Sequence, residues 1–174
     1  NNIIVGKSDP EKELYDEIYF ARRNIYRIKI PKYIKTIKSC AFDYCQHLCC
    51  IEFEKNTKLE TIGDYSFAFT NMHDVVIPKS VSTIGKYCFA ECLSLNSFKL
   101  EPNSKLESLS KGLLNNCRNL CNVEFPKNSA LKRIEEYTFC NTRIYSLNLP
   151  QNFQKFEDGS LYLAFSLSTL CFSF

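Results

Sequence analysis

The sequence predicts an α/β repeat solenoid, a coil in which similar units stack on one another and share a core. Two independent observations predict this fold class. A large apolar residue recurs every 22 to 25 residues, at Phe42, Phe67, Phe89, Leu114, Phe139 and Leu161. Short strand-like runs recur with the same period, at Ile28, Ile51, Val75, Phe98, Val123 and Leu147. One such unit cannot bury its apolar face alone, so neighbouring units must stack.

The unit from Asp74 to Leu95 shows the predicted elements in order. Val75 and Ile77 alternate with their neighbours as in a half-buried strand, and Pro78 removes the backbone donor that would extend it. Apolar residues then recur every three to four positions, which keeps one face of the returning chain inward. They are Val81, Ile84, Cys88, Phe89, Cys92 and Leu95.

The most specific parts of the repeat are an Ile-Pro pair and an Ile-Gly-x-x-Cys-Phe-x-x-Cys run. In this unit the whole pattern reads Val75-x-Ile77-Pro78-x-x-Val81-x-x-Ile84-Gly85-x-x-Cys88-Phe89-x-x-Cys92-x-x-Leu95. It resembles the BspA-like subclass of leucine-rich repeats, and the likeness covers roughly residues 25–167. Where ordinary leucine-rich repeats carry Asn, this chain carries Cys45, Thr70, Cys92, Cys117 and Thr142.

The resemblance implies both a geometry and a role. The geometry is a right-handed coil with a parallel concave β-sheet and short helical or 3-10 turns on the convex side. The role is a non-enzymatic binding module of a surface protein, used by bacteria and protists to attach to host cells or extracellular matrix. Its partner would be a protein or glycan ligand there, and its location the cell surface or extracellular space.

We expect three parts along the chain. Residues 1–24 form an N-terminal cap, residues 25–167 form six repeats of about 24 residues, and residues 168–174 begin a further strand or a C-terminal cap. Terminal repeats of solenoids are usually atypical, because they cover an open end of the stack. The apolar end of the chain is predicted to associate end to end with another copy or to continue into further sequence.

The N-terminal cap is predicted to be helical. Ser8 or Asp9 would be the N-cap, and Pro10 would occupy the first helical position. Leu14, Ile18 and Ala21 would then lie on one face of the helix.

Composition restricts the function classes. Of 174 residues, 45% are hydrophobic and 24% are charged, as in an ordinary soluble globular domain. The net charge of +3 is too small to indicate nucleic acid, and we expect no nucleic-acid partner. The first seven residues are too short for a signal peptide. The last 15 are shorter than the roughly 20 that span a bilayer, so no membrane insertion is expected.

Basic residues are concentrated near the start of the repeats. Seven of them fall within 17 residues that contain no acid, namely Arg22, Arg23, Arg27, Lys29, Lys32, Lys35 and Lys38. One hypothesis is that this cluster binds an anionic polymer such as a heparin-like glycan. The alternative is a solvated basic edge without a partner.

The ten cysteines predict a structural role rather than a metal site. Cys45, Cys92 and Cys117 share one repeat position, and Cys49 and Cys121 share another. Equivalent positions in stacked units point the same way, so we expect ladders of buried thiols inside the coil. The spacing is a poor match to a zinc site. A disulfide between ladder neighbours stays open in an oxidising compartment.

No pattern in the sequence indicates catalysis or a cofactor. His47 and His73 lie 26 residues apart without a recurring Asp or Ser near them. Neither a Gly-rich phosphate loop nor a Gly-x-Ser-x-Gly or His-Glu-x-x-His motif occurs. We therefore expect no enzyme activity, no cofactor and no metal.

The candidate binding residues are the strand residues whose side chains point away from the core, on the concave face. They are Arg27, Lys29, Glu52, Asp74, Val76, Ser97, Lys99, Asn122, Glu124, Ser146 and Asn148, with Cys50 in the same columns. Their mixed charge suits a polar protein or glycan more than nucleic acid. Tyr65, Tyr87 and Tyr137 share a further position, where they either cover the convex side or form an aromatic stripe for a partner.

An alternative function is an intracellular leucine-rich-repeat scaffold or interaction protein in the cytoplasm. The chain contains no Asn-x-Ser/Thr glycosylation acceptor, and ten thiols suit a reducing compartment.

Overall fold

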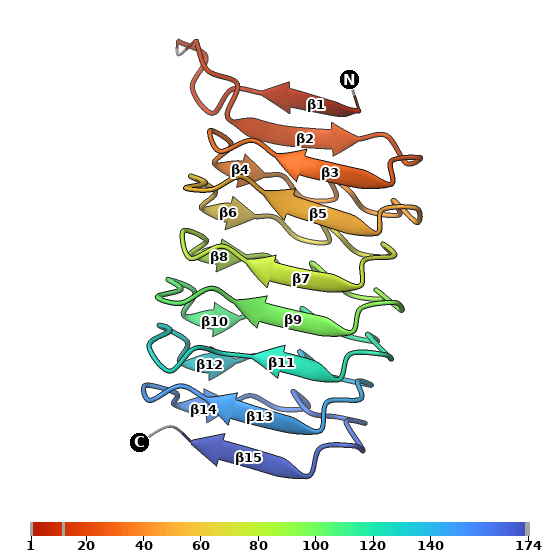
Figure 1. Cartoon of the computed structure of the whole chain (residues 1–174), viewed down its shortest axis with the longest axis vertical. Coiled ribbons are helices and arrows are strands. Elements are labelled where there is room, and N and C mark those ends of the chain that lie inside the picture. Colours follow the sequence, from red (N-terminus) through yellow and green to blue (C-terminus); the bar gives the residue numbers. More distant parts are fainter. Residues whose placement is uncertain (1, 12, 173–174) are drawn as a thin grey trace.

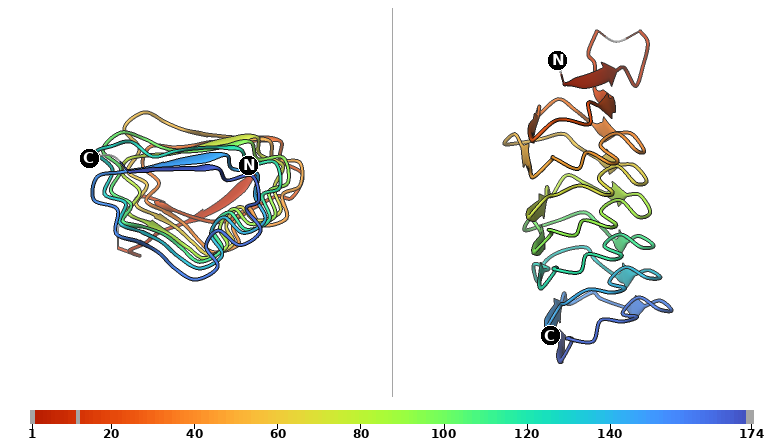
Figure 2. Two further views of the ribbon diagram at one scale, coloured as in Figure 1. Left: turned by 90° about the horizontal axis from the view of Figure 1, so that it is seen from below. Right: turned by 90° about the vertical axis from the view of Figure 1, so that its right-hand side faces the viewer.

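The computed structural model describes residues 2–11 and 13–172 as a stack of β-coils (Figure 1). One side of the stack carries the long strands β3 (Arg27–Ile30), β5 (Cys50–Phe53), β7 (Asp74–Ile77), β9 (Ser97–Leu100), β11 (Asn122–Glu124), β13 (Ser146–Leu149) and β15 (Thr169–Phe172). The other carries the two-residue strands β4 (Thr36–Ile37), β6 (Thr61–Ile62), β8 (Thr83–Ile84), β10 (Ser108–Leu109), β12 (Arg133–Ile134) and β14 (Lys155–Phe156). Seen along the stack axis, the coils superimpose around one interior (Figure 2). The predicted parallel solenoid is confirmed.

Neighbouring strands on each side pair in parallel, but the long-strand side is divided into three sheets. These are β3–β5, β7–β9–β11 and β13–β15. The two divisions fall before β7 and β13. Thr70 and Thr142 precede these two strands by four residues, whereas Cys92 precedes β9 by five.

The predicted helical cap is wrong. β1 (Ile3–Gly6) and β2 (Glu17–Ala21) form an antiparallel hairpin, and β2 pairs in parallel with β4 so that Ile18 lies beside Ile37. An isolated helix of this length is marginal in water, whereas a strand here gives partners to the edge groups of β4. The N-terminal segment therefore covers the end of the stack as β-structure.

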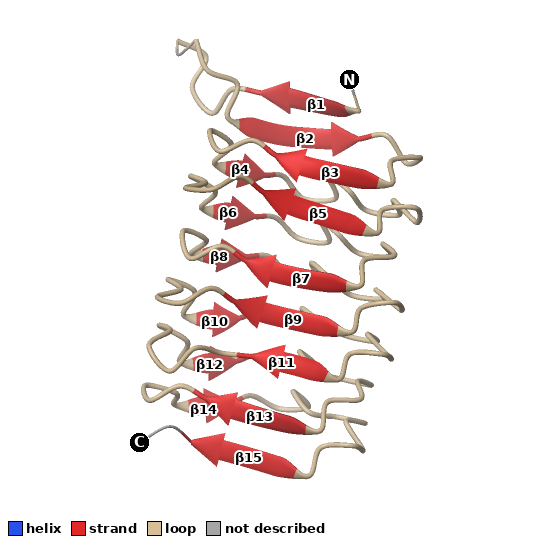
Figure 3. Cartoon of the chain, in the orientation of Figure 1, coloured by secondary structure: helices blue, strands red, loops and turns tan. Residues whose placement is uncertain are grey.

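The predicted helical or 3-10 turns on the return path are also wrong, and the described residues contain no helix (Figure 3). In each repeat the residues two before and two after the large apolar anchor have positive φ, which interrupts a helix. The pairs are Cys40 and Tyr44, Tyr65 and Phe69, Tyr87 and Glu91, Gly112 and Asn116, Tyr137 and Asn141, and Gly159 and Leu163.

The backbone amides of this segment bond to the next coil instead of to their own. Tyr65, Phe67 and Phe69 donate to carbonyl groups of the following repeat at 2.8 to 3.0 Å. A helix would direct these N–H groups back along its own chain. The stack therefore gains rungs of hydrogen bonds on the side where helical turns were expected.

The core is a column of apolar side chains along the axis. The ring of Phe67 lies between those of Phe42 and Phe89, with centroid distances of 4.9 and 5.3 Å. All three rings are buried. Burial of such a side chain contributes about 1.5 to 3 kcal/mol, and a ring pair adds about 0.5 to 1.5 kcal/mol. The recurring anchor seen in the sequence is thus the main packing contact between coils.

The thiol ladder is confirmed in part. Cys45, Cys92 and Cys117 are buried, and Cys92 and Cys117 donate to carbonyl groups of the preceding coil at 3.2 and 3.1 Å. The second cysteine position is not interior, because Cys49 is half-buried and Cys121 is exposed. That position lies just before each long strand, where the chain is still at the surface. All ten cysteines are free thiols.

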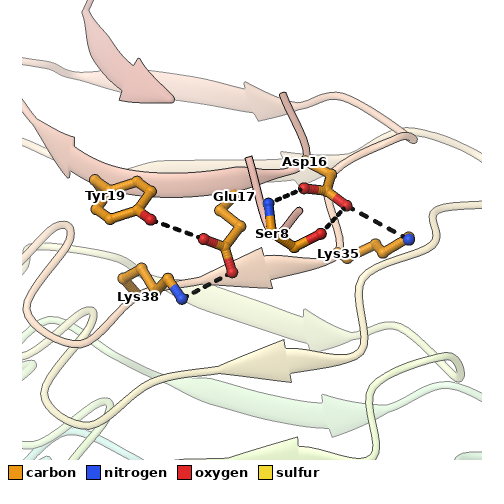
Figure 4. A network of polar contacts seen from close by, with 6 residues as sticks. All are labelled: Ser8, Asp16, Glu17, Tyr19, Lys35 and Lys38. Atoms are coloured by element: carbon orange, nitrogen blue, oxygen red, sulfur yellow. Dashed lines mark hydrogen bonds and ion pairs between the residues drawn. The ribbon is translucent and has the colours of Figure 1, made fainter. Parts of the chain in front are cut away.

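A polar network joins the N-terminal hairpin to the first repeat (Figure 4). The carboxylate of Asp16 accepts hydrogen bonds from the backbone N and Oγ of Ser8 at 2.8 and 2.7 Å, and lies 3.4 Å from Lys35 Nζ. The bonds from Ser8 hold the pKa of Asp16 at about 2, below its ordinary value of 3.8. Glu17 pairs with Lys38 Nζ at 2.7 Å. Both carboxylates are thereby satisfied where the hairpin buries them.

Candidate binding surface

The long strands present two columns of outward side chains, which we call the sheet face. Within each sheet the register places column members side by side. Arg27 lies beside Cys50, Lys29 beside Glu52, Ser146 beside Thr169 and Asn148 beside Cys171, while in the middle sheet Ser97 lies between Asp74 and Asn122, and Lys99 between Val76 and Glu124. The predicted residues are therefore brought together in three blocks, one for each sheet. Two breaks in backbone pairing separate the blocks.

Most predicted residues of the sheet face are exposed, with two exceptions. Ser97 is buried, at 7% exposure, and Lys99 is half-buried. Apart from these two, the predicted side chains are available to a partner. The face is therefore open and almost entirely polar, with Val76 as its one apolar member.

The strongest polar contact on the sheet face joins β9 to β11. Lys99 Nζ lies 2.7 Å from Glu124 Oε1, and Asn122 Nδ2 donates to the same carboxylate oxygen at 3.1 Å. The hydrogen bond from Lys99 lowers the pKa of Glu124, and the bond from Asn122 lowers it further. This trio holds a fixed pattern of charge in the middle of the surface.

A hollow of about 310 Å³ lies where the sheet face meets the loops. It contains two predicted residues, Glu124 and Asn148, and the apolar groups that line it come from the ends of β9 and β11. The lining consists of Leu100, Pro102, Glu124, Phe125, Pro126 and Asn148. The hollow lies beside the gap in pairing between β11 and β13. A hollow of this volume is large enough to hold one side chain of a partner.

The tyrosine column covers neighbouring coils. The rings of Tyr65 and Tyr87 stack with centroids 5.3 Å apart. Tyr87 then lies against Gly112, and Tyr137 lies against Gly159. Gly112 separates Tyr137 from the stacked pair of Tyr65 and Tyr87, so the rings do not form a continuous stripe.

The seven basic residues of the segment 22–38 do not form one patch. Arg27 and Lys29 lie on β3, whereas Lys35 and Lys38 flank β4 on the opposite side of the stack. Lys35 and Lys38 are paired with Asp16 and Glu17. The run of sequence follows one coil around the core, and this divides its charge between two faces.

A different basic feature was missed by the sequence analysis. The loops that follow the long strands gather along one edge of the stack, on the left in Figure 1, which we call the loop edge. Four of the six repeats carry a Lys just after the strand, at the second position in Lys32, Lys55 and Lys79 and at the third in Lys127. The members of this column are far apart in sequence, so reading along the chain does not bring them together. Aligning the repeats would have found them.

The described part of the chain contains neither a metal site nor a membrane-spanning helix. No group of three or more His, Cys, Asp or Glu in residues 2–11 and 13–172 is arranged to hold a metal ion. Across the same residues, no helix is long and apolar enough to cross a membrane. His47 and His73 are both exposed on separate coils.

Solved structures with a similar fold are bacterial leucine-rich-repeat proteins. A protein from Eubacterium ventriosum has a TM-score of 0.63 and 21% identity, covering 88% of this chain and 47% of its own. One from Bacteroides ovatus has a TM-score of 0.50 and 18% identity, covering 99% and 68%. The pneumococcal vaccine antigen PcpA matches at 0.42 with 19% identity, covering 86% and 51%.

The Eubacterium and Bacteroides structures establish the fold alone. This chain spans about half the length of PcpA and of the Eubacterium protein. No curated protein sequence matches the chain. A model of the BspA type leucine rich repeat region, in six copies, matches residues 12–126 and 60–173. The two matches together span nearly all of the stack of coils, and the predicted resemblance is confirmed: the chain belongs to the BspA-type leucine-rich-repeat family.

Proposed function

We propose that this chain is a protein-binding module of a surface protein, and that it contributes to adhesion to host cells or extracellular matrix. The observation that supports this most is the sheet face, a row of exposed polar side chains held at the spacing of parallel strands. Membership of a family whose members include surface proteins supports the location. The proposed partner is a polar protein or glycan on the host cell or matrix.

The geometry suits a large partner better than a small molecule. Strands in a sheet lie about 4.8 Å apart, so the sheet face presents charged and amide groups at regular intervals over its length. Binding of this kind gains from a rigid scaffold, because little side-chain or loop freedom is lost. Lys29, Glu52, Asp74 and Glu124 supply both signs of charge, which favours a partner of complementary pattern over a uniformly charged one.

A second candidate function is an intracellular scaffold. The observation that favours it is the set of ten free thiols, of which Cys40, Cys121 and Cys171 are exposed. Exposed thiols persist more readily in a reducing compartment. Titration of the thiols in protein from its natural source separates the two: ten free thiols favour the cell interior, and oxidised cysteines favour the surface.

Binding to intact host-type cells and to immobilised matrix proteins tests the adhesion proposal. A sheet-face variant carries Asp74→Ala, Asn122→Ala and Asn148→Ala, all at exposed positions. The matched control carries Lys86→Ala, Arg118→Ala and Arg143→Ala, at exposed positions away from the sheet face. Phe89→Ala serves as an unfolded control, because this ring is buried in the core.

We expect saturable binding by the wild type and the matched control, and a loss of at least about tenfold in the sheet-face variant, as for removal of central interface contacts. Equal loss in the sheet-face variant and the matched control would contradict a role for the sheet face. Absence of wild-type binding to every surface would leave the scaffold function.

A further inference from the structure

The loop edge carries an excess of positive charge that the rest of the surface does not. Its loops comprise residues 31–33, 54–58, 78–80, 101–105, 126–129 and 150–152. They contain six lysines, Lys32, Lys55, Lys58, Lys79, Lys105 and Lys127, and two acids, Glu54 and Glu101. The other edge carries mixed charges that pair, as in the 2.6 Å contact between Lys111 and Glu136.

Backbone contacts bring these lysines together from separate coils. The backbone N of Lys58 donates to the carbonyl of Lys32 at 2.8 Å, and that of Lys105 donates to the carbonyl of Lys79 at 3.2 Å. Lys55 and Lys79 line one notch of about 220 Å³ between the loops. The lysines therefore lie on successive loops along the axis of the stack, from the first repeat to the fifth.

The two acids of the loop edge are occupied by the fold. Glu101 Oε2 accepts a hydrogen bond from the backbone N of Lys79 at 2.9 Å. Glu54 Oε2 accepts one from the backbone N of Lys32 at 3.0 Å, and its Oε1 lies 3.9 Å from Lys29 on the sheet face. Each carboxylate thus fixes a turn of the preceding coil rather than neutralising a lysine ammonium of the loop edge.

The six ammonium groups have no ion pair with any residue in the described ranges 2–11 and 13–172. Like charges on neighbouring strands or loops repel, so this arrangement does not stabilise the fold. A multivalent anion bound along the lysines would neutralise them and remove this repulsion. Association with such a partner also releases the small anions held near the lysines.

We propose that the loop edge binds a linear sulfated polysaccharide that runs parallel to the axis of the stack. Lys32 and Lys127 lie four coils apart, a distance of about 19 Å at the usual strand spacing. One lysine per coil repeats at a distance of the same order as one sugar ring, which suits an anionic group on each ring. Between the lysines, Asn56 offers an amide to sugar hydroxyl groups, whereas Asn128 Nδ2 donates to Asn103 Oδ1 at 2.7 Å and so ties two neighbouring loops together.

Nucleic acid fits the loop edge less well. Single strands are bound through aromatic rings that stack on bases and through Arg, which forms planar bidentate contacts. The loops of this edge contain no Arg, and Tyr33 is their one aromatic residue. This site is separate from the sheet face, so disproof of one proposal leaves the other unaffected.

The experiment measures affinity for immobilised heparin, chemically desulfated heparin and duplex DNA over a range of salt concentrations. The edge variant carries Lys32→Gln, Lys55→Gln, Lys79→Gln and Lys127→Gln, all at exposed positions. The matched control loses the same charge at exposed positions elsewhere, through Lys86→Gln, Arg118→Gln, Arg133→Gln and Arg143→Gln. Circular dichroism and thermal unfolding establish that both variants remain folded.

We expect the wild type and the matched control to bind heparin, and the edge variant to lose at least about tenfold in affinity with a weaker dependence on salt. Desulfated heparin should bind weakly to all three proteins. Absence of wild-type binding, or equal loss in both variants, would overturn the proposal. Binding of DNA as tight as that of heparin would overturn the sugar specificity and assign the row to polyanions in general.

Discussion

The ring of Tyr87 occupies the space that a side chain at Gly112 of the next coil would need. A Cβ added at Gly112 would overlap Cδ1, Cε1 and Cζ of that ring, and Gly112 has a φ of 63°. Tyr137 stands in the same relation to Gly159, whose φ is 66°. Glycine is favoured at these two positions, because the backbone is left-handed and the ring of the preceding coil lies over the Cα.

Gly112→Ala should destabilise the protein through both causes. The left-handed backbone alone costs an alanine about 1 to 2 kcal/mol, and the overlap with Tyr87 adds to this. Urea unfolding measures the loss. In a Tyr87→Ala background the overlap is absent, so the cost of Gly112→Ala should fall. An equal cost in both backgrounds would show that the ring of Tyr87 does not occupy this space.

Phe67→Ala should be among the most destabilising single substitutions, because its ring stacks on Phe42 and on Phe89. Truncation of a buried phenylalanine costs about 3 to 5 kcal/mol. Tyr145→Ala, which removes a ring that is 58% exposed, is the comparison and should change stability by less than about 0.5 kcal/mol. Thermal unfolding followed by circular dichroism compares them. Similar melting temperatures for the two variants would contradict a core built on the phenylalanine column.

Asp16 should make stability depend on pH in the acid range. Its folded-state pKa of about 2 lies below the ordinary value of 3.8, so its ionised form stabilises the fold at pH values above the ordinary value. This contribution should be lost as pH falls through 3.8 toward 2. Asp16→Asn should be less stable at neutral pH and should lose less further stability on acidification.

Glu13→Gln, at an exposed carboxylate, is the control for Asp16→Asn and should keep the wild-type dependence. Denaturant unfolding at a series of pH values gives the curves. Superimposable curves for the wild type and Asp16→Asn would contradict the network that joins Ser8, Asp16 and Lys35.

Thiol reactivity should separate the cysteines by position in the coil. Cys40, Cys121 and Cys171 are exposed and should react first with a thiol reagent in the native protein. The buried thiols are Cys45, Cys88, Cys92 and Cys117, and they should react only on unfolding. Burial also raises the pKa of Cys88 well above its ordinary value, which lowers its thiolate fraction further. Mass spectrometry of timed reactions identifies the order, and early labelling of Cys92 would contradict the buried ladder.

The sequence predicted the stack because large buried residues leave a periodic signal. Phe42, Phe67 and Phe89 recur at the same interval as the strands. Both periodicities arise because the stacked repeats share one core. The outward columns follow from the alternation of side chains along a strand. The residues predicted for this face lie on the long strands, and all are exposed except the buried Ser97 and the half-buried Lys99, while their role in binding stays a prediction.

The helices were predicted wrongly because spacing of three to four residues does not distinguish a helix from a succession of turns. The distinguishing signal is the exchange of Tyr for Gly at one position, as in Tyr87 and Gly112. Glycine in a column of larger residues indicates a left-handed backbone. Tyr65, Tyr87 and Tyr137 take that conformation despite its cost. The amides of Tyr65 and Tyr87 donate to carbonyl groups of the next coil, and the rings of all three contact it.

The grouping of charges also could not be obtained from proximity along the chain. Lys35 and Lys38 are close to Arg27 in sequence. The chain passes around the core between them, so they lie on opposite sides of the stack. Lys79 and Lys105 lie in different repeats and are joined by a backbone hydrogen bond. In a solenoid the neighbours of a surface residue are found one repeat away, so charge must be summed down columns.

The central claim, that the sheet face recognises a partner through its charge pattern, is tested most directly by exchanging Lys99 and Glu124. The double substitution Lys99→Glu and Glu124→Lys keeps the net charge and places opposite charges at the same two positions, which are 2.7 Å apart at their charged atoms in the wild type, but reverses the direction of the pair. We predict unchanged thermal stability together with loss of saturable binding to host-type cells or matrix proteins. Binding at wild-type strength by the folded double variant would contradict recognition by this face.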